Sequence, residues 1–441
     1  MGLLEQGFCG NAKGLQRTRG LACVHSGFNA LEATPIGSID EGKLPSSMPA
    51  AVVLGDLSLV RPLSSVRVVV ATGDDSHVVR HSRHVHTVWP LPAHGPNSRA
   101  AELSGILALG RRLLGRLGTR VPLFYGSDWH LELLYRNREE LSECFLFQLN
   151  DDELAWTLHD KARFYAHCEQ IGIRVPRMLL TGAEDDATAE RVLNQWKVPL
   201  LVKPKCKPYP VELRSLGFSQ GSKARAFASG QALVAERALL ELRDQLVIQE
   251  LVPNRAQDLY SFHGFCGDDG RLLASFCGHK LRTFPNFGGE SAFIELVKDT
   301  QLDGQGREVV EKLQLKGPFK IDLVRDPRTG QLLTLEVNAR FSLWNYLGAA
   351  HGVNLPRVAY DYLVEGRTPA RPPDYTPRFR WLDAYRDYLA FRQGGAGGLG
   401  LLGWLLPIVS APCIYDTFAW DDPLPCLGWW SQIFRRRLAG R

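Results

Sequence analysis

The sequence predicts an α/β domain followed by an α+β domain. Between residues 48 and 150, the apolar runs AAVVL and VRVVVA are short enough for buried strands, and the stretch between them suits a crossover. Such a pair begins a parallel sheet. After residue 150 the expected strands cluster instead of alternating with helices, which is typical of an α+β domain. Residues 1–47 show no sustained periodicity, and we expect a poorly ordered extension there.

The remaining elements follow from local patterns. In the first domain, residues 103–117 carry a helical stripe and residues 122–125 form a further strand. The second domain is expected at residues 151–370, with a lid lobe at about 175–252, and residues 371–441 form a helical tail. The elements expected in the second domain are helix 151–171, strand 198–203, helix 229–242, and strands 246–251, 260–265, 272–280, 319–325 and 331–338.

Composition excludes several classes of protein. Apolar residues make up 45% and charged residues 22% of the chain, as in ordinary globular proteins. The 52 basic and 47 acidic residues give a net charge of +5, which is too small to indicate nucleic-acid binding. Nine scattered cysteines without a CxxC pair favour free thiols in a reducing, cytoplasmic compartment over zinc or disulfide sites. No secretory signal is expected.

Two apolar segments near the C-terminus raise the question of membrane contact. The stretch GLGLLGWLLPIVS at residues 398–410 is shorter than the roughly 20 residues of a membrane span and contains Pro407, so we expect a buried helix. Further on, Trp429 and Trp430 precede three arginines at 435–437. Packing of these aromatics on the body is favoured over membrane contact, because each arginine contributes only about 1 kcal/mol near an anionic surface.

Four histidines, His77, His81, His84 and His86, also invite a metal-binding interpretation. Their uneven spacing suits neither one helix face nor one strand face. We expect these side chains at the surface or in loops.

The strongest chemical signal is the hairpin around DPRTG at residues 326–330. Glu336 and Asn338 are two residues apart, so on a strand they project from the same face, and Asp322 on the partner strand can lie beside them. Three hard oxygen ligands on one face suit Mg²⁺ bound to nucleotide phosphates. Arg340, two residues further on, can bind a phosphate or carboxylate through two hydrogen bonds. A solvated hairpin face is the alternative, but Glu336 stands in an apolar strand, which favours the metal site.

Two weaker signals precede the hairpin. Lys203 ends an apolar strand, where a lysine can reach a nucleotide phosphate as a point charge. The run VIQELVP at residues 247–253 is a strand leading into a hinge, which can present backbone groups to an adenine edge. Either pattern alone is common in unrelated proteins.

Taken in order, these features resemble the ATP-grasp superfamily, and within it the predicted carboxylate–amine ligases that include D-aspartate ligase-like and polysaccharide-cluster proteins. The resemblance covers about residues 48–370, with a fainter match at 415–423. The most specific matches are FKIDLVRDPRTG at 319–330 and LEVNARFSLWNYLGAAHGVNLP at 335–356. The other matching stretches are VVLGD at 52–56 with Arg61, FYGSD at 124–128, DK at 160–161, LVKP at 201–204, VIQELVP at 247–253 and HKLRTFP at 279–285.

The resemblance implies a Rossmann-like α/β domain of the pre-ATP-grasp type, followed by a two-lobed α+β ATP-grasp domain. It also implies roles for individual residues. The implied ATP ligands are Lys161 and Lys203 at the phosphates or adenine, Glu250 and Val252 at the adenine hinge, and Asp258 near the ribose. The implied groups at the reacting centre are Lys280 and Arg282 at the γ-phosphate or substrate acid, Arg340 at the transferring phosphoryl group, and Asp322, Glu336 and Asn338 at Mg²⁺, with Mn²⁺ as an alternative.

Three positions depart from the family pattern. The loop after Lys203 lacks a tight Gly-rich phosphate loop, for which Lys205, Lys207 or Lys223 would compensate. Asp322 stands where a glutamate is more usual, and Ala339 stands where many relatives have proline.

The activity implied is ligation. A substrate carboxylate attacks the γ-phosphate of Mg-ATP, and an amine then displaces phosphate from the acyl phosphate. The expected partners are therefore a small-molecule acid and an amine, without nucleic acid or membrane, and a homodimer is left open. The alternatives are a carboxylase-like or kinase-like ATP-grasp enzyme, a non-catalytic nucleotide-binding scaffold and, with less support, a membrane-associated assembly factor.

Overall fold

The computed structural model describes residues 41–73, 78–93, 98–180, 182, 184–206, 211–219, 223–253, 256–286, 288–394 and 400–438. Most of the expected N-terminal extension, residues 1–40, lies outside the described part. Residues 41–47 were assigned to the same extension, but they form the short helix η1 (Glu41–Lys43) and bury Leu44 in the core of the first domain. The first domain therefore begins nearer residue 41 than residue 48.

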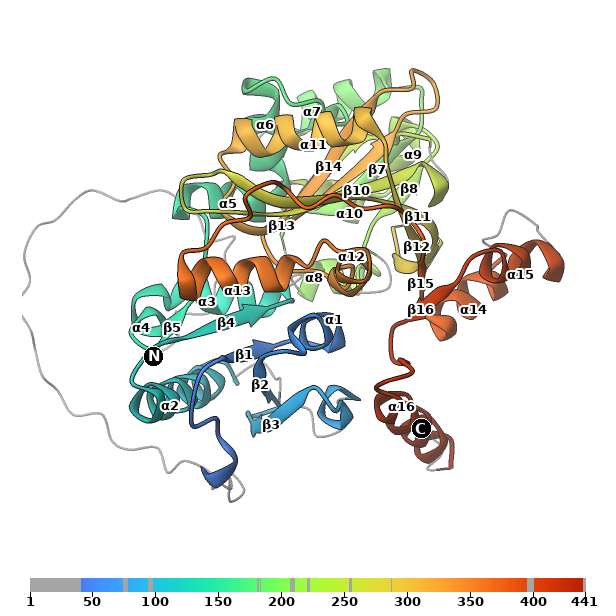
Figure 1. Ribbon diagram of the computed structural model, residues 1–441. Helices are drawn as coiled ribbons and strands as arrows, with labels where there is room; N and C mark the ends of the chain where they lie inside the picture. The colour runs from blue at the N-terminus through green and yellow to red at the C-terminus, as the bar shows by residue number, and fades with distance from the viewer. Residues whose placement is uncertain are drawn as a thin grey trace, which may run out of the picture.

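The first domain contains a five-stranded parallel sheet with strand order β3-β2-β1-β4-β5 (Figure 1), as the α/β prediction requires. Alternate residues of β1 enter different cores, because strand side chains project to the two faces in turn. Val52 packs in the core that contains α2, whereas Val53 packs in the core shared with the second domain. The elements are β1 (Ala50–Leu54), α1 (Leu57–Val60), η2 (Arg61–Leu63), β2 (Arg67–Thr72), η3 (Val78–His81), β3 (Val85–Pro90), α2 (Arg99–Leu117), β4 (Val121–Tyr125), α3 (Asp128–Arg136), α4 (Arg138–Ser142) and β5 (Phe145–Leu146).

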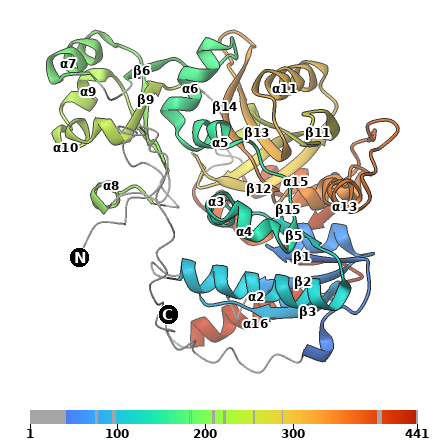
Figure 2. The ribbon, with the colours of Figure 1, turned by 90° about the vertical axis from the view of Figure 1, so that its left-hand side faces the viewer.

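The second domain is built on a seven-stranded sheet with strand order β14-β13-β10-β11-β12-β15-β16. Its strands pair antiparallel except β15 and β16, which are parallel. Helices α5, α6 and α11 cover one face with an apolar core, and α12 and α13 lie between the other face and the first domain (Figures 1 and 2). The elements are α5 (Asp152–His159), α6 (Lys161–Gln170), β10 (Leu259–Cys266), β11 (Leu272–Phe284), β12 (Glu290–Val297), α11 (Thr300–Leu313), β13 (Gly317–Arg325), β14 (Leu332–Asn338), α12 (Asn345–Ala350) and α13 (Leu355–Glu365).

A smaller lobe stands apart from this sheet with a core of its own (Figure 2). It contains a four-stranded sheet with strand order β6-β9-β7-β8 and helices on its outer side. The large sheet and this lobe together give the predicted two-lobed α+β architecture. The elements of the lobe are β6 (Met178–Leu180), α7 (Asp186–Gln195), β7 (Leu200–Pro204), α8 (Val211–Ser215), β8 (Arg225–Phe227), α9 (Gly230–Val234), α10 (Arg237–Glu241), η4 (Arg243–Gln245) and β9 (Leu246–Glu250), followed by η5 (Ala256–Asp258).

The C-terminal region was expected to be helical, but it also supplies two strands to the large sheet. Its elements are β15 (Arg380–Leu382), α14 (Ala384–Arg392), α15 (Leu401–Val409), β16 (Cys413–Tyr415) and α16 (Leu424–Leu438). The apolar segment expected as a buried helix is helix α15, but the expectation of burial is wrong, because Leu402 is 83% exposed. Among the described residues, no helix is both long and apolar enough to cross a bilayer.

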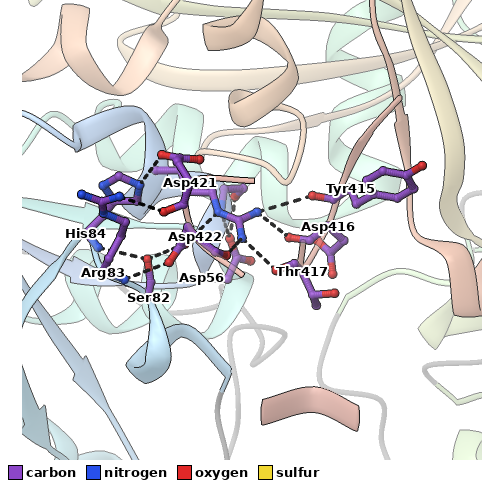
Figure 3. A network of polar contacts seen from close by, with 11 residues as sticks. Asp56, Ser82, Arg83, His84, Tyr415, Asp416, Thr417, Asp421 and Asp422 are labelled. Atoms are coloured by element: carbon purple, nitrogen blue, oxygen red, sulfur yellow. Dashed lines mark hydrogen bonds and ion pairs between the residues drawn. The ribbon is translucent and has the colours of Figure 1, made fainter. Parts of the chain in front are cut away.

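The chain after β16 returns to the first domain, where Asp421 and Asp422 lie beside Ser82, Arg83 and His84 (Figure 3). The buried guanidinium of Arg61 donates through Nε to Asp422 Oδ2 at 3.1 Å and through Nη2 to the carbonyl of Thr417 at 2.8 Å. Asp422 also accepts from Ser82 Oγ at 2.7 Å. Segments more than 300 residues apart in the sequence are therefore joined by a buried ion pair.

The histidine group does not gather around one point in the described residues. His77 lies outside them. His84 contacts Asp421 through Nε2 at 3.2 Å. His81 packs closely against α16, because a Cβ atom at Gly428 would lie 2.6 Å from His81 Cδ2.

Candidate active site

The hairpin β13–β14 places the predicted metal ligands on one face of the large sheet. Asp322 lies directly opposite Glu336, and Lys320 lies directly opposite Asn338. On the neighbouring strand β10, Ser261 lies opposite Asp322 and His263 opposite Lys320. Directly opposite residues project from the same face of a sheet, so two rows of polar side chains run across β10, β13 and β14.

The hairpin turn that sets this register follows from its sequence. Gly330 has a φ of 70°, a conformation in which a glycine avoids the strain that a Cβ atom would cause. Its N–H donates to the carbonyl of Asp326 at 2.7 Å, and the Asp326 carboxylate accepts from Arg328. These hydrogen bonds within the turn fix the positions at which β13 and β14 pair.

Asp322 is the centre of a buried charged cluster. Its Oδ1 lies 2.9 Å from Lys280 Nζ and its Oδ2 lies 2.7 Å from Lys320 Nζ. Ser261 Oγ donates to Oδ1 at 2.7 Å. Burial by itself would raise the pKa of Asp322, but Lys280 and Lys320 outweigh burial and hold the pKa well below its usual range. The carboxylate is therefore ionised at neutral pH.

Lys320 belongs to this cluster, although it is not among the site residues predicted from the sequence. Burial lowers the pKa of Lys320, while Asp322 opposes that effect. The signal was present in the sequence, because Lys320 stands two residues before Asp322 on the same strand and must share its face.

The second strand of the hairpin leads from the sheet to the first domain. Asn338 Nδ2 donates to Glu336 Oε1 at 3.2 Å, and Arg340 Nη2 donates to Asn338 Oδ1 at 3.5 Å. Arg340 Nε lies 2.5 Å from Oδ1 of Asp128, the first residue of α3, and its Nη1 donates to the carbonyl of Gly126. Arg340 therefore joins the predicted metal ligands to the first domain.

The donor set fits a divalent cation. Asp322 and Glu336 supply two carboxylates and Asn338 an amide oxygen, which are the hard ligands that Mg²⁺ prefers. Within the described ranges, no three His, Cys, Asp or Glu side chains are grouped so that they could hold a metal ion.

An aromatic wall borders the charged face. His263 stacks between Phe276 and Trp344, with centroid distances of 4.7 Å and 4.9 Å. Burial holds the pKa of His263 well below its usual value, so its ring is neutral beside Lys320. Gly278 allows Trp344 to approach, because a Cβ at that position would lie 1.9 Å from the indole ring.

Lys203 reaches from the small lobe to the edge of the large sheet. Its Nζ donates to the hydroxyl of Tyr165 at 2.6 Å, and that hydroxyl donates to the carbonyl of Leu335 on β14. Burial and the nearby Lys161 lower the pKa of Lys203 to about 7, while Glu336 opposes them. The lysine thus faces the same end of β14 as the predicted metal ligands.

Lys161 owes its position to a helix cap. Asp160 accepts hydrogen bonds from the N–H groups of Ala162 and Arg163, which begins α6 at Lys161. Lys161 Nζ donates to the carbonyl of Lys205 at 3.2 Å. Of the lysines expected to compensate for the missing Gly-rich loop, Lys207 lies outside the described residues, and Lys223 forms an ion pair with Glu290 at 3.3 Å.

The expected adenine hinge follows β9. The N–H of Glu250 donates to the carbonyl of Arg177, and the N–H of Leu251 donates to the carbonyl of Pro199. The carboxylate of Glu250 accepts from Arg328 at 3.1 Å, so its side chain is engaged by the β13–β14 turn. Val252 is buried at the end of this segment, and Asp258 ends η5 before β10.

Arg282 does not join the cluster around Asp322, which corrects the expectation that it accompanies Lys280. On β12, Lys280 lies opposite Ile294 but Arg282 lies opposite Phe293, so a bulge inserts one residue between them. The bulge turns Arg282 to the other face. There its guanidinium forms two hydrogen bonds with the buried Asp387 of α14, at 2.6 Å and 3.0 Å.

A pocket lies where the first domain meets the end of β14. Helix α3, helix α5 and the start of α6 line it together with residues 336–339. Its polar side chains include Asp128, Glu132, His159 and Lys161. The pocket therefore opens beside two of the three predicted metal ligands.

Comparison with known sequences finds one type of ligase. No protein-family model matches the chain. A D-aspartate ligase from Enterococcus faecium (strain Aus0004) is 22% identical over an alignment of 254 residues, which covers 56% of this chain. The chain spans 58% of the length of that relative.

Comparison with solved structures identifies the fold. The biotin carboxylase domain of the Hydrogenobacter thermophilus 2-oxoglutarate carboxylase, in complex with MgADP, ADP and bicarbonate, has a TM-score of 0.55 at 15% identity, covering 75% of this chain and 73% of that one. The N5-carboxyaminoimidazole synthetase from Staphylococcus aureus has a TM-score of 0.52 at 11% identity, covering 75% and 80%. This chain has the fold of these two structures, which is the ATP-grasp fold predicted from the sequence.

Proposed function

We propose that this chain, which has the ATP-grasp fold, is an Mg²⁺- and ATP-dependent ligase that joins a carboxylic acid to an amine. The observation that carries the proposal is the pairing of Asp322 with Glu336 on one sheet face, beside Lys280 and Lys320. Carboxylates for a cation and lysines for phosphate oxygens are the two components that phosphoryl transfer needs.

ATP would bind between the small lobe and the large sheet. Lys203 and Lys161 are assigned to its phosphates, because both lie near the end of β14. The backbone between Glu250 and Val252 is assigned to the adenine and Asp258 to the ribose. Lys280 and Lys320, which neutralise Asp322 in the unliganded protein, are assigned to the γ-phosphate.

Asp322, Glu336 and Asn338 would hold the cation, with Mn²⁺ as a substitute for Mg²⁺. When bound, the cation would supply positive charge that stabilises the negative charge of the transferring phosphoryl group. Lysines placed where charge develops add to this stabilisation without reorganising during the reaction.

The proposed reaction has two steps. A carboxylate oxygen of the acid attacks the γ-phosphorus of ATP, the bond to the β-phosphate oxygen breaks, and ADP leaves. The nitrogen of the amine then attacks the acyl carbon, phosphate leaves with the electron pair of the C–O bond, and the amine loses a proton. Arg340 is assigned to the transferring phosphoryl group, because it is anchored beside Asn338.

The sequence relative suggests where to look for the acid. Its name, D-aspartate ligase, supports aspartate and related amino acids as the first candidates. The proposed partners are small molecules in the cytoplasm.

Product analysis tests the proposal. The purified chain is incubated with ATP, Mg²⁺, pooled acids that include both aspartate enantiomers, and pooled amines, and ADP and the coupled product are measured. ADP release that requires both acid and amine supports ligation. ADP release that requires bicarbonate indicates a carboxylase, a stable phosphorylated product indicates a kinase, and nucleotide binding without turnover under any of these conditions indicates a scaffold.

A further inference from the structure

Exposed apolar side chains are concentrated in the C-terminal region. Of the thirteen large hydrophobic residues of the described part that are strongly exposed, ten lie between residues 385 and 430. Isolated exposed leucines are normal on protein surfaces, but a concentration of this kind marks a surface with a partner.

Helix α15 presents the clearest part of this surface. Leu402, Leu406 and Val409 are 83%, 66% and 74% exposed, and their spacing of four and three residues places them on one side of the helix. The helix is attached through Trp404, whose ring stacks on Phe391 at 4.7 Å and whose Nε1 donates to Asp387. The attachment leaves the leucine side uncovered.

Helix α16 carries a second group of exposed apolar residues. Leu424 and Leu427 are 56% and 63% exposed, and Trp430 is 48% exposed. The neighbouring Trp429 contacts Tyr385 of α14 at a centroid distance of 5.5 Å, which links the helices. Helices α14, α15 and α16 lie on one side of the molecule, at the right in Figure 1 and at the back in Figure 2.

Acidic residues are absent from α15 and α16, whereas the segment between these helices contains Asp416, Asp421 and Asp422. Residues 393–412 contain no charged side chain, and residues 424–441 contain four arginines and no aspartate or glutamate. Short helices with exposed leucine and tryptophan next to arginines are typical of helices that lie in the interface of a membrane with anionic lipids.

We propose that the C-terminal surface, formed by the exposed sides of α15 and α16, binds an anionic lipid surface without crossing the bilayer. The cationic sequence of α16 is complementary to anionic lipid headgroups, which favours this occupant over a second copy of the chain. The contact of Trp429 with Tyr385 agrees with the packing expected for these aromatics, so the exposed leucines of α15 are the observation that favours a lipid surface.

Vesicle sedimentation tests the proposal on the full chain. We expect the protein to pellet with vesicles of phosphatidylcholine mixed with phosphatidylglycerol, and to remain in solution with phosphatidylcholine alone. Replacing Arg435, Arg436 and Arg437 by glutamine should weaken binding about 100-fold at low salt. Leu406→Asp should weaken it about tenfold or more.

Val211→Asp is the matched control, because Val211 is 65% exposed on α8, away from the C-terminal surface, and should bind like the unchanged protein. If Val211→Asp loses as much vesicle binding as Leu406→Asp, the proposal is overturned. Failure of the unchanged protein to pellet with anionic vesicles would also overturn it. A dimer in solution that Leu406→Asp dissociates, without vesicle binding, would show that the surface joins two copies instead. The test uses only lipid binding, so its result is independent of the proposed ligase activity.

Discussion

Asp322 and Glu336 lie directly opposite each other on β13 and β14, so two carboxylates share one site on the sheet. Like charges at directly opposite positions destabilise a sheet. Lys280 and Lys320 neutralise Asp322, while the amide of Asn338 donates to Glu336. These contacts stabilise the two neighbouring carboxylates of Asp322 and Glu336, and a bound cation would stabilise them further.

Glu336→Gln should abolish most phosphoryl transfer while the protein still folds. The substitution keeps the volume of the side chain and removes one anionic ligand, and losing such a group costs about 2.7–4 kcal/mol, or roughly 10²–10³-fold in rate. Hydroxylamine traps an acyl phosphate as a hydroxamate, so hydroxamate formation with ATP, Mg²⁺ and the substrate acid measures the effect. Glu308→Gln on the exposed face of α11 is the matched control. Full hydroxamate formation by Glu336→Gln would contradict the metal assignment.

ATP binding should take up a proton between pH 7 and pH 10. Lys203 has a pKa of about 7 in the unliganded protein, below the ordinary 10.5, chiefly because it is buried. Phosphate oxygens favour the charged lysine, so ATP raises the pKa and binding weakens as the pH rises through about 7. Calorimetry in buffers of different ionisation enthalpy measures the uptake. Lys203→Met should bind ATP more weakly and without this uptake, and an unchanged uptake in the variant would assign the proton elsewhere.

Arg282→Met should affect stability more than chemistry. Breaking the buried ion pair leaves Asp387 without a countercharge and lowers the free energy of unfolding by about 3–5 kcal/mol. Lys298→Met, in an exposed pair with Asp374, should cost at most about 1 kcal/mol. Denaturant unfolding measures both. If Arg282→Met has the unfolding free energy of the unchanged protein but loses activity per folded molecule, Arg282 belongs to the reacting centre.

Asp416→Asn should stabilise the protein increasingly as the pH rises. Burial, followed by the charges of Asp383 and Asp56, raises the pKa of Asp416 from 3.8 to about 7. The folded protein then keeps a proton that the unfolded chain loses, so this group lowers the unfolding free energy as the pH rises between those values. Asparagine cannot ionise, so the variant does not lose this stability. After allowance for the partial exposure of the side chain, we expect its unfolding free energy to exceed that of the unchanged protein by about 1–2 kcal/mol at high pH. Thermal unfolding at several pH values measures the difference, and a constant difference would contradict the raised pKa.

The sequence was sufficient for the parts of the site that depend on strand periodicity. Glu336 and Asn338 share a face because side chains alternate along β14, and the DPRTG turn brings Asp322 beside them. The same alternation places Lys320 on this face, although Lys320 is not among the predicted site residues. The apolar runs of the first domain likewise identified a parallel sheet, because strands buried on both faces need apolar residues throughout.

Only the tertiary structure decided the direction of Arg282, the neighbours of Asp322 and the exposure of α15. The bulge in β11 arises from pairing with β12, which no local pattern of β11 reveals. Ser261 and Lys280 reach Asp322 through the strand order of the sheet, which joins residues distant in the sequence. Apolar composition predicts that α15 avoids water, but it cannot predict whether the folded chain provides a partner for the leucines. Periodicity is a local property of the chain, whereas pairing and burial depend on contacts between distant segments.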